Sequence, residues 1–303
     1  MNASFLLSLL MVSRPEIEGE RLIRRLLEQN TDYGGVLTYI TGAMGGGKTS
    51  AMFAFLKYTM HTFPLQKIFL SETYDAPLQC FKLGIQNCNF LVKEESKVVF
   101  RDISNQLKTA KMIKPIYFKD FDDLYKKAER GKCNVVFFGD RTVWMEFLAF
   151  LRHTGEWNHV FIDEIGEVIP SNTSGKLHKR IGQFAIFSKD LRKCRIKVIA
   201  NTQSIRDMDW RMLDKFMFRV FLPGAIADVK HSRVMQRAID NLQGDDKTGN
   251  HAFIDRFGKF GLVLFSDIFK PDPRYMIEAH IEGQDEYLVI KEDVPLPTAT
   301  VNP

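Results

Sequence analysis

The sequence has few cysteines, and their spacing excludes several classes of site. Its 303 residues include four cysteines, and none of them forms a C-x-x-C pair with another. A zinc knuckle or a disulfide framework needs closely and regularly spaced cysteines. We therefore expect reduced thiols in a cytoplasmic protein, and no metal site built from cysteine and histidine.

Long apolar runs are also missing. The apolar run at residues 5–12 is far shorter than the roughly 20 residues that cross a bilayer, and no lysine or arginine precedes it. We expect this run to dock as a strand or a helical turn rather than to serve as a signal or an anchor. The sequence therefore predicts no stable membrane insertion.

The chain also lacks a strong excess of charge of one sign. Its formal net charge is +5, which does not by itself indicate nucleic acid as a partner. One segment departs from this balance, because residues 176–197 carry eight cations against the single acid Asp190. Such a segment suits the phosphate backbone of double-stranded DNA or an interface between subunits, and the two are compatible. Its cations are Lys176, Lys179, Arg180, Lys189, Arg192, Lys193, Arg195 and Lys197.

What the chain does contain is a glycine-rich motif at residues 42–49, which reads GAMGGGKT and fits G-x-x-x-x-G-K-[ST]. Its glycines allow backbone N–H groups to surround phosphate oxygens, Lys48 can reach the β and γ phosphates, and Thr49 can ligate Mg²⁺. An apolar strand precedes the motif and a helix follows it, so the positive end of the helix lies under the anion. We expect ATP and Mg²⁺ to bind here, with the nucleotide held by Gly42, Gly45, Gly46, Gly47, Lys48, Thr49 and Ser50.

Short apolar runs alternate with segments of helical periodicity between residues 34 and 270. Strands followed by helices are typical of βαβ units and of a mainly parallel sheet. We predict an α/β, three-layer P-loop NTPase fold of the RecA/ASCE type, with helices on both faces of the sheet. The strands are expected at 36–41, 67–71, 116–118, 134–138, 159–162, 196–200, 218–222 and 261–265, and the helices at 50–58, 121–130, 142–152, 177–191, 208–216 and 225–242.

The chain divides into three predicted parts. Residues 1–33 form a helical or docking segment, 34–270 the P-loop ATPase domain, and 271–303 an extended C-terminal arm rich in proline. Residues 73–113 are polar and show no firm period, so we interpret them as an insertion in the ATPase domain.

An acidic pair follows one of the predicted strands. The apolar run 159–162 ends directly before Asp163 and Glu164. A nucleotide hydrolase needs a carboxylate near the metal and a second group that activates water. We therefore expect Asp163 to ligate Mg²⁺ and Glu164 to act on the attacking water.

The predicted strand at 196–200 ends in Asn201-Thr202-Gln203. An amide there would lie between the phosphate-loop strand and the acidic strand, so we expect Gln203 to sense the γ-phosphate through the water. Catalysis also needs a cation on the developing charge, often an arginine from a neighbouring subunit. The candidates near this strand are Arg192, Arg195, Arg206 and Arg211.

The order and spacing of these motifs resemble the FtsK–HerA superfamily of DNA-pumping ATPases, whose neighbourhood includes viral genome-packaging ATPases and Zot-like phage assembly proteins. GAMGGGKTS resembles the first family motif, VFIDEIGEVIP the second, and RKCRIKVIANTQS a stretch in which an arginine, an apolar strand and Thr-Gln follow one another. The resemblance covers roughly residues 34–225. In this register Arg192 matches the arginine finger that acts in trans, and Gln203 matches the glutamine at the strand end. Arg195 stands where many relatives have glycine, so it is the alternative finger.

The resemblance implies an ATPase that forms a hexameric or pentameric ring with DNA in its channel. The compact size favours a viral genome-packaging motor, which would work at a capsid or portal vertex. The alternatives are a Zot-like phage assembly or export ATPase and a plasmid or conjugative DNA-transfer ATPase. A GTPase, an ABC ATPase and a small-molecule kinase are less compatible, because the motifs that would identify the first two are missing and kinases generally lack the acidic pair followed by a strand ending in glutamine.

Overall fold

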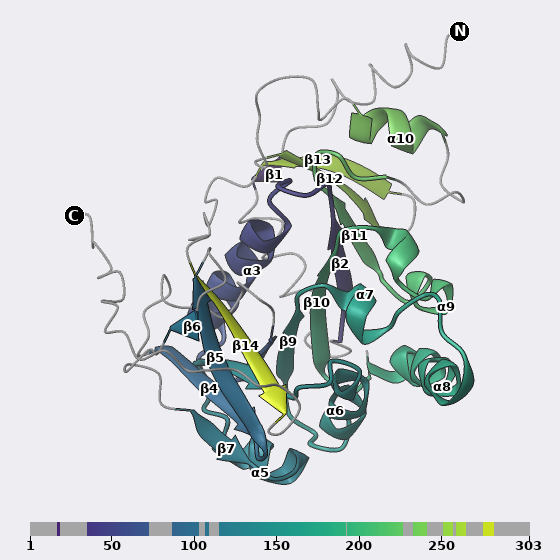
Figure 1. The fold of residues 1–303 in the computed structure, drawn as a ribbon. Coiled ribbons are helices and arrows are strands. Elements are labelled where there is room, and N and C mark those ends of the chain that lie inside the picture. The colour runs from purple at the N-terminus through teal and green to yellow at the C-terminus, as the bar shows by residue number, and fades with distance from the viewer. Residues whose placement is uncertain are drawn as a thin grey trace, which may run out of the picture.

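The fold is built around one large sheet (Figure 1). The computed structural model describes residues 17–18, 35–72, 87–102, 107–108, 115–191, 193–226, 233–240, 251–256, 259–264 and 275–281. Most of the predicted ATPase domain lies within these ranges. They include few residues of the two predicted terminal segments.

Eight neighbouring strands of the large sheet run parallel to one another. Each consists of a short, mostly apolar run, as expected for strands that are covered on both faces. In spatial order they are β11 (Phe218–Phe221), β2 (Leu37–Thr41), β10 (Ile196–Thr202), β9 (Asn158–Ile162), β3 (Lys67–Ser71), β8 (Cys133–Phe137), β4 (Cys88–Lys93) and β7 (Ile116–Phe118).

Additional strands extend the sheet beyond β11. Strand β12 (His251–Arg256) pairs with β11 in the antiparallel direction and continues through a hairpin into β13 (Lys259–Leu264). The short strand β1 (Ile17–Glu18) pairs with β13 in parallel. The sheet therefore has a parallel centre and a mixed edge, which agrees with the prediction of a mainly parallel sheet.

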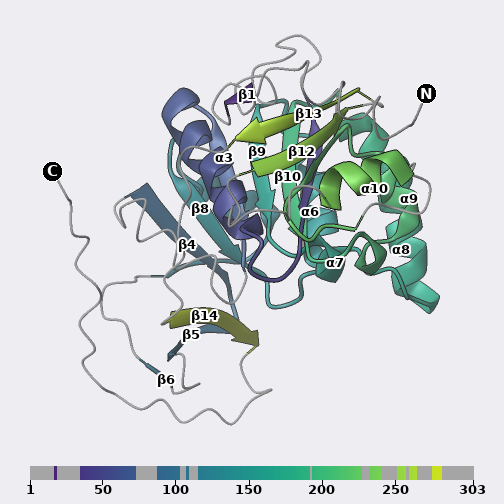
Figure 2. The same cartoon turned by 90° about the horizontal axis from the view of Figure 1, so that it is seen from above.

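A second, smaller sheet joins segments that are far apart in the sequence (Figure 2). Strand β14 (Tyr275–Ile281) pairs with β5 (Ser96–Asp102), which pairs in turn with β6 (Leu107–Lys108). Part of the predicted C-terminal arm is thus a strand that lies on the predicted insertion. The neighbouring β4 belongs instead to the large sheet. The division of the chain into three parts stays a prediction.

Helices cover both faces of the sheet, so the predicted three-layer fold is confirmed (Figures 1 and 2). Successive side chains of β9 point to opposite faces of the sheet, with Val160 and Ile162 on one face and Phe161 on the other. Both faces are therefore apolar and need a covering layer. One face carries α3 (Lys48–Thr62), whose Phe53 and Phe55 are fully buried and each contribute roughly 1.5–3 kcal/mol. The other face carries α5 (Phe121–Lys127), α6 (Val143–Leu151), α7 (Ile165–Val168), α8 (Gly175–Leu191), α9 (Trp210–Leu213) and the end of α10 (Arg233–Asp240).

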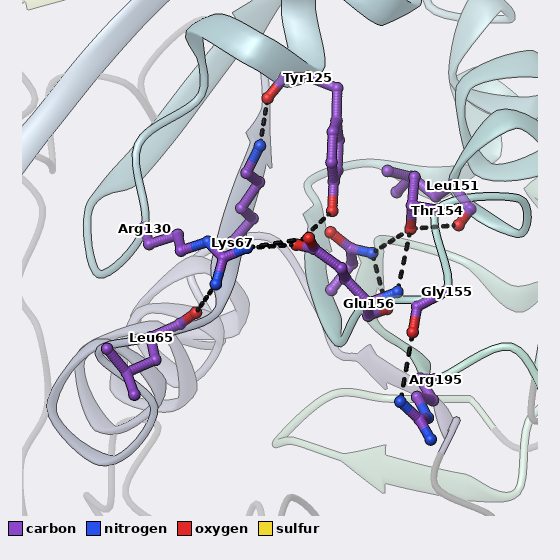
Figure 3. Close-up of polar contacts among 10 residues, drawn as sticks. Leu65, Lys67, Tyr125, Arg130, Leu151, Thr154, Gly155, Glu156 and Arg195 are labelled. Carbon is purple, nitrogen blue, oxygen red and sulfur yellow. Dashed lines mark hydrogen bonds and ion pairs between the residues drawn. The ribbon is translucent and has the colours of Figure 1, made fainter.

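A polar network joins the amino ends of the central strands (Figure 3). Lys67 begins β3 and donates to the backbone carbonyl of Tyr125, while its ammonium lies 3.6 Å from the Tyr125 ring centroid. Arg130 donates to both carboxylate oxygens of Glu156, at 2.9 and 3.0 Å, and the Tyr125 hydroxyl donates to Glu156 at 3.0 Å. These contacts tie α5 to the turn that precedes β9, at the edge opposite the phosphate loop.

Several local predictions were wrong, among them one helix and one strand of the large sheet. The helix expected at 208–216 is the short α9, because Met208 forms a bridge with Pro170 and Asp209 caps the helix by accepting the N–H of Arg211 at 2.9 Å. The segment 88–93 forms β4 inside the sheet although no strand was predicted there. In the described part of the chain, no helix combines the length and the apolar character needed to cross a membrane.

Candidate nucleotide hydrolysis site

The predicted site residues meet at the carboxyl ends of three adjacent strands. Strand β10 lies between β2, which leads into the phosphate loop, and β9, which leads into the acidic pair. Thr202 pairs with Thr41, and Ala200 pairs with Ile162. Residues 201–203 therefore lie between the loop and the acids, at the edge where parallel sheets bind ligands.

The loop at 42–47 needs glycine at two positions for different reasons. Gly47 ends the loop with φ 85°, a left-handed conformation that glycine adopts at little cost. A Cβ on Gly46 would lie 2.9 Å from the carbonyl oxygen of Pro223, so a side chain there would collide with the backbone. Among the described residues, no side chain caps α3. The first N–H groups of the helix are therefore available to a phosphate.

Lys48 lies over the loop that it follows. Its ammonium donates to the carbonyl oxygens of Gly42 and Ala43, at 3.2 and 3.0 Å, and the residue is buried. Burial lowers the pKa of Lys48, while the negative charges of Glu164 and Asp163 oppose that shift. These interactions agree with the strand order, which brings the loop and the acidic pair to one edge of the sheet.

Asp163 is nearly inaccessible to solvent, at 4% exposure. Its backbone N–H donates to the Ser71 hydroxyl at 2.9 Å, and its carboxylate accepts a hydrogen bond from the side-chain amide of Asn201. No cluster of three or more His, Cys, Asp or Glu residues that could hold a metal occurs in the ranges that the structure describes. The oxygen donors of Asp163 and of the partly exposed Thr49 fit Mg²⁺, which usually takes one or two protein ligands together with substrate phosphates.

Glu164 has an unusual backbone conformation for a residue other than glycine. Its φ and ψ are 50° and 63°, in the left-handed region that costs roughly 1–3 kcal/mol. Its N–H donates to the Asn201 side-chain oxygen at 2.7 Å, and its carboxylate accepts the backbone N–H of Gln203 at 3.3 Å. Burial is the main cause that raises the pKa of Glu164, followed by the Asp163 charge, while Lys48 and Gln203 act in the opposite direction.

The structure also shows site residues that the motifs did not single out. Asn201 is fully buried and contacts both members of the acidic pair, whereas the prediction for this strand end centred on Gln203. Ser71, at the end of the neighbouring β3, and Arg141, on the turn after β8, both hydrogen-bond to the backbone of Asp163. A polar residue at the end of a buried strand was the available signal for Asn201 and Ser71. No local pattern marks Arg141.

The arginines lie in different parts of the molecule. Arg192 lies outside the described residues. Arg195 precedes β10, where its carbonyl accepts the N–H of Asn158 at 3.1 Å and its guanidinium donates to the Gly155 carbonyl at 3.3 Å (Figure 3). The seven residues of β10 separate it from the phosphate-loop edge by roughly 23 Å, at about 3.3 Å per residue. Arg211 forms an ion pair with Asp209 at 2.7 Å.

Only some of the cations in the basic segment at residues 176–197 are exposed to solvent. Lys176, Lys179, Lys189 and Lys193 are exposed, and those on α8 fall within an arc of about 140° at 3.6 residues per turn. Arg180 forms an ion pair with Glu146 at 2.6 Å. Lys197 is buried, with its ammonium 4.9 and 5.0 Å from the ring centroids of Phe63 and Trp157. Lys197 therefore does not contribute to a solvent-facing basic patch, although it was counted in one.

The likenesses to known proteins are found among solved structures. No family model matches the chain, and no curated protein matches its sequence. Among solved structures, the genome packaging NTPase B204 from Sulfolobus turreted icosahedral virus 2, in complex with ATP-gammaS, is 10% identical, with a TM-score of 0.47 over 75% of this chain and 96% of that chain.

Two further structures belong to transfer and secretion systems. The pCW3 conjugation coupling protein TcpA is 11% identical, with a TM-score of 0.42 over 78% of this chain and 61% of that chain. The type VII secretion ATPase EccC of Thermomonospora curvata is 13% identical, with a TM-score of 0.42 over 77% of this chain and 25% of that chain. At these identities the likeness concerns the fold and not the activity, substrate or partners of this chain.

Proposed function

We propose that this chain is an ATP-hydrolysing motor that moves double-stranded DNA through a ring of its own copies, in the role of a viral genome-packaging ATPase. The observation that carries the proposal is the position of Glu164. This carboxylate lies beside the phosphate loop, has a raised pKa and accepts the backbone N–H of Gln203, while Asn201 accepts the backbone N–H of Glu164 itself. A nucleotide-binding protein without hydrolysis has no need of such a group.

Each residue of the site has a defined part in hydrolysis. The loop N–H groups and Lys48 would hold the β and γ phosphates and offset their charge. Thr49 and Asp163 would hold Mg²⁺, which supplies charge neutralisation at the phosphates when bound. Glu164 would accept a proton from the attacking water, and its raised pKa makes it a better base than an exposed glutamate.

Gln203 would report the state of the nucleotide to the rest of the chain. Its N–H already contacts the Glu164 carboxylate, and its side chain is exposed at the strand end. It is followed directly by Ser204 and the short 3-10 helix Ile205–Asp207, which contacts α7. A movement of Gln203 in response to the γ-phosphate would therefore be passed along the chain to this 3-10 helix, which contacts α7 and precedes α9.

The exposed lysines of α8 support DNA as the partner. Three cations on one helix face, without a compensating ion pair among the described contacts, suit the regular negative charge of a duplex. Arg195, at the amino end of β10, is too far from its own phosphate loop to act there, and its guanidinium contacts the Gly155 carbonyl instead. Arg192 is proposed as the finger on the resemblance described above.

The experiment that tests the proposal combines two measurements on the full chain. ATP hydrolysis is measured without DNA, with double-stranded DNA and with single-stranded DNA, and the mass in solution is measured with and without nucleotide. We expect hydrolysis that duplex DNA stimulates, together with a mass of five or six chains. Stimulation by single strands alone would favour the Zot-like alternative. A monomer whose hydrolysis is indifferent to DNA would overturn the translocase, and Lys48→Ala provides the inactive control.

A further inference from the structure

Arg141 lies on a rigid turn near the site but outside every predicted motif. The turn connects β8 to α6, and the Asp140 carboxylate fixes it by accepting both the N–H and the hydroxyl of Thr142 at 2.8 Å. Strand β3 lies between β8 and β9, so the two strand ends are roughly 10 Å apart at about 4.8 Å per strand. An arginine is among the few side chains long enough to cross that gap.

The guanidinium of Arg141 does cross it. One terminal nitrogen donates to the backbone carbonyl of Asp163, and the other forms an ion pair with Glu167 at 2.6 Å. The Arg141 side chain is 15% exposed and that of Glu167 is 51% exposed, so the bond to the Asp163 carbonyl is the more shielded of the two contacts. A bond from a charged donor to a carbonyl is among the stronger hydrogen bonds in proteins.

A buried carboxylate lies near enough to the same guanidinium to interact with its charge. Glu72 follows β3 and is 8% exposed, and its oxygens accept the Phe138 N–H at 3.1 Å and the indole N–H of Trp144 at 2.7 Å. Burial raises the pKa of Glu72, while the positive charge of Arg141 acts to lower it. Arg141 is therefore placed by a fixed backbone turn and by its contacts with Glu167 and with the Asp163 carbonyl.

The carbonyl that Arg141 contacts belongs to a particular peptide unit. The oxygen of Asp163 and the N–H of Glu164 are the two polar ends of one planar group. Asn201 accepts that N–H at 2.7 Å from the opposite side. The peptide is thus held at both ends, by side chains from β10 and from the β8–α6 turn.

Holding this peptide matters because the next residue is strained. Glu164 has φ 50°, and rotation of the Asp163–Glu164 peptide would change that φ and redirect the carboxylate. Strained conformations persist only where their surroundings over-determine them. The two hydrogen bonds supply that constraint.

We propose that Arg141 is a positioning residue for hydrolysis, which with Asn201 clamps the Asp163–Glu164 peptide and so keeps the Glu164 carboxylate directed at the nucleotide. The inference rests on the proposed function for its effect on turnover. Its structural part, that the clamp holds the peptide, stands independently of any activity. Arg141 touches neither nucleotide nor water in this scheme and acts only through Glu164.

The kinetic test compares Arg141→Gln with the matched control Glu167→Gln. Arg141→Gln removes the charge-assisted bond to the carbonyl, and we expect kcat for ATP to fall about 10- to 100-fold. The dissociation constant of a fluorescent ATP analogue should stay within about twofold, because the phosphate loop is untouched. Glu167→Gln removes only the ion pair and should keep kcat within about threefold. Arg141→Lys, which retains a charged donor, should recover part of the loss.

A second measurement separates the clamp from the proposed function. Amide hydrogen exchange in peptides that include Glu164 is followed without nucleotide, in the wild type, Arg141→Gln and Glu167→Gln, with thermal unfolding to confirm that each variant is folded. Faster exchange at Glu164 in Arg141→Gln alone supports the clamp even if the wild type proves unable to hydrolyse ATP. Unchanged exchange in a folded variant would overturn it, as would an equal effect of Glu167→Gln on exchange and turnover.

Discussion

The backbone N–H of Gln203 donates to the Glu164 carboxylate at 3.3 Å, so the end of β10 touches the acid that follows β9. This contact places the proposed base and the proposed sensor of the γ-phosphate in one hydrogen-bonded unit. Any movement of Glu164 during hydrolysis would therefore be transmitted to β10 and to the segment that follows it.

Replacing Glu164 by Gln should separate binding from turnover. The amide keeps the size of the side chain but cannot accept a proton from water, so we expect kcat to fall by about 10²- to 10⁴-fold. Nucleotide affinity should change little, as measured by titration with a fluorescent ATP analogue. Unchanged turnover would remove Glu164 as the water-activating group.

The pH profile of the wild-type enzyme gives a second test of Glu164. Only the ionised carboxylate can act as a base, and burial and Asp163 raise its pKa above the ordinary value of 4.5. The rate should therefore fall as the pH drops through this raised pKa, at a higher pH than an exposed glutamate would give. The acid limb of kcat/KM, measured at low ATP concentration, reports the pKa in the nucleotide-free chain.

Mixed rings should show which arginine acts in trans. Arg192→Ala alone should lose about 10³-fold or more in turnover, and mixing it with Glu164→Gln subunits should restore activity, because each partner supplies what the other lacks. Arg195→Ala is the comparator, and we expect it to retain activity, since its guanidinium already contacts the Gly155 carbonyl. Failure of the mixture to recover would count against a finger at Arg192.

The exposed face of α8 should govern DNA affinity. We expect a triple change to glutamate at Lys176, Lys179 and Lys189 to weaken duplex binding more than tenfold, and to reduce the slope of log K against log salt by about 0.9 per lost contact. Fluorescence anisotropy over a range of KCl concentrations measures both quantities.

A control with the same change in charge comes from elsewhere on the surface. Lys57, Lys93 and Lys126 are exposed and lie on α3, β4 and α5, away from α8. Changing these three lysines to glutamate should leave the salt slope close to that of the wild type. Loss of ring assembly without loss of DNA affinity in the α8 variant would instead identify this face as a subunit interface.

His159 should make the folded state sensitive to acid. It is buried against Phe63 with one ring nitrogen 2.5 Å from the Gln66 side-chain oxygen, and burial, aided by the charge of Lys197, holds its pKa well below 6.5. In the unfolded chain the His159 side chain takes up a proton near pH 6.5, whereas in the folded chain it does so only at a lower pH. The free energy of unfolding should therefore decrease as the pH falls below 6.5, by at most about 1.4 kcal/mol per pH unit for one proton.

Urea unfolding between pH 7.5 and 5.5 measures this dependence. His159→Gln should flatten it, whatever its effect on stability at neutral pH. His153→Gln, which changes an exposed histidine, should keep the slope of the wild type. An equal slope in all three proteins would show that the proton of His159 does not limit stability.

The amino-acid sequence predicted those features that depend on neighbouring residues in the chain. Glycines that permit a left-handed turn, a lysine directly after them and an acidic pair after a buried strand each predict their own surroundings, and the structure places them at one sheet edge. No strand was predicted at β4 because its apolar run at residues 90–92 is short and lies in a mostly polar segment, and its place in the sheet depends on pairing with β7 and β8.

Local sequence patterns could not predict residues that act together from different strands of the sheet. Arg141 and Asn201 are separated by 60 positions, yet they hold the two ends of one peptide. Their partnership depends on strand order, because β9 must lie beside β10 and one strand away from β8 before both side chains can reach it. Local residue types sufficed to locate a phosphate loop and its acids. The packing of distant strands was needed to show how the acid that follows β9 is held in place.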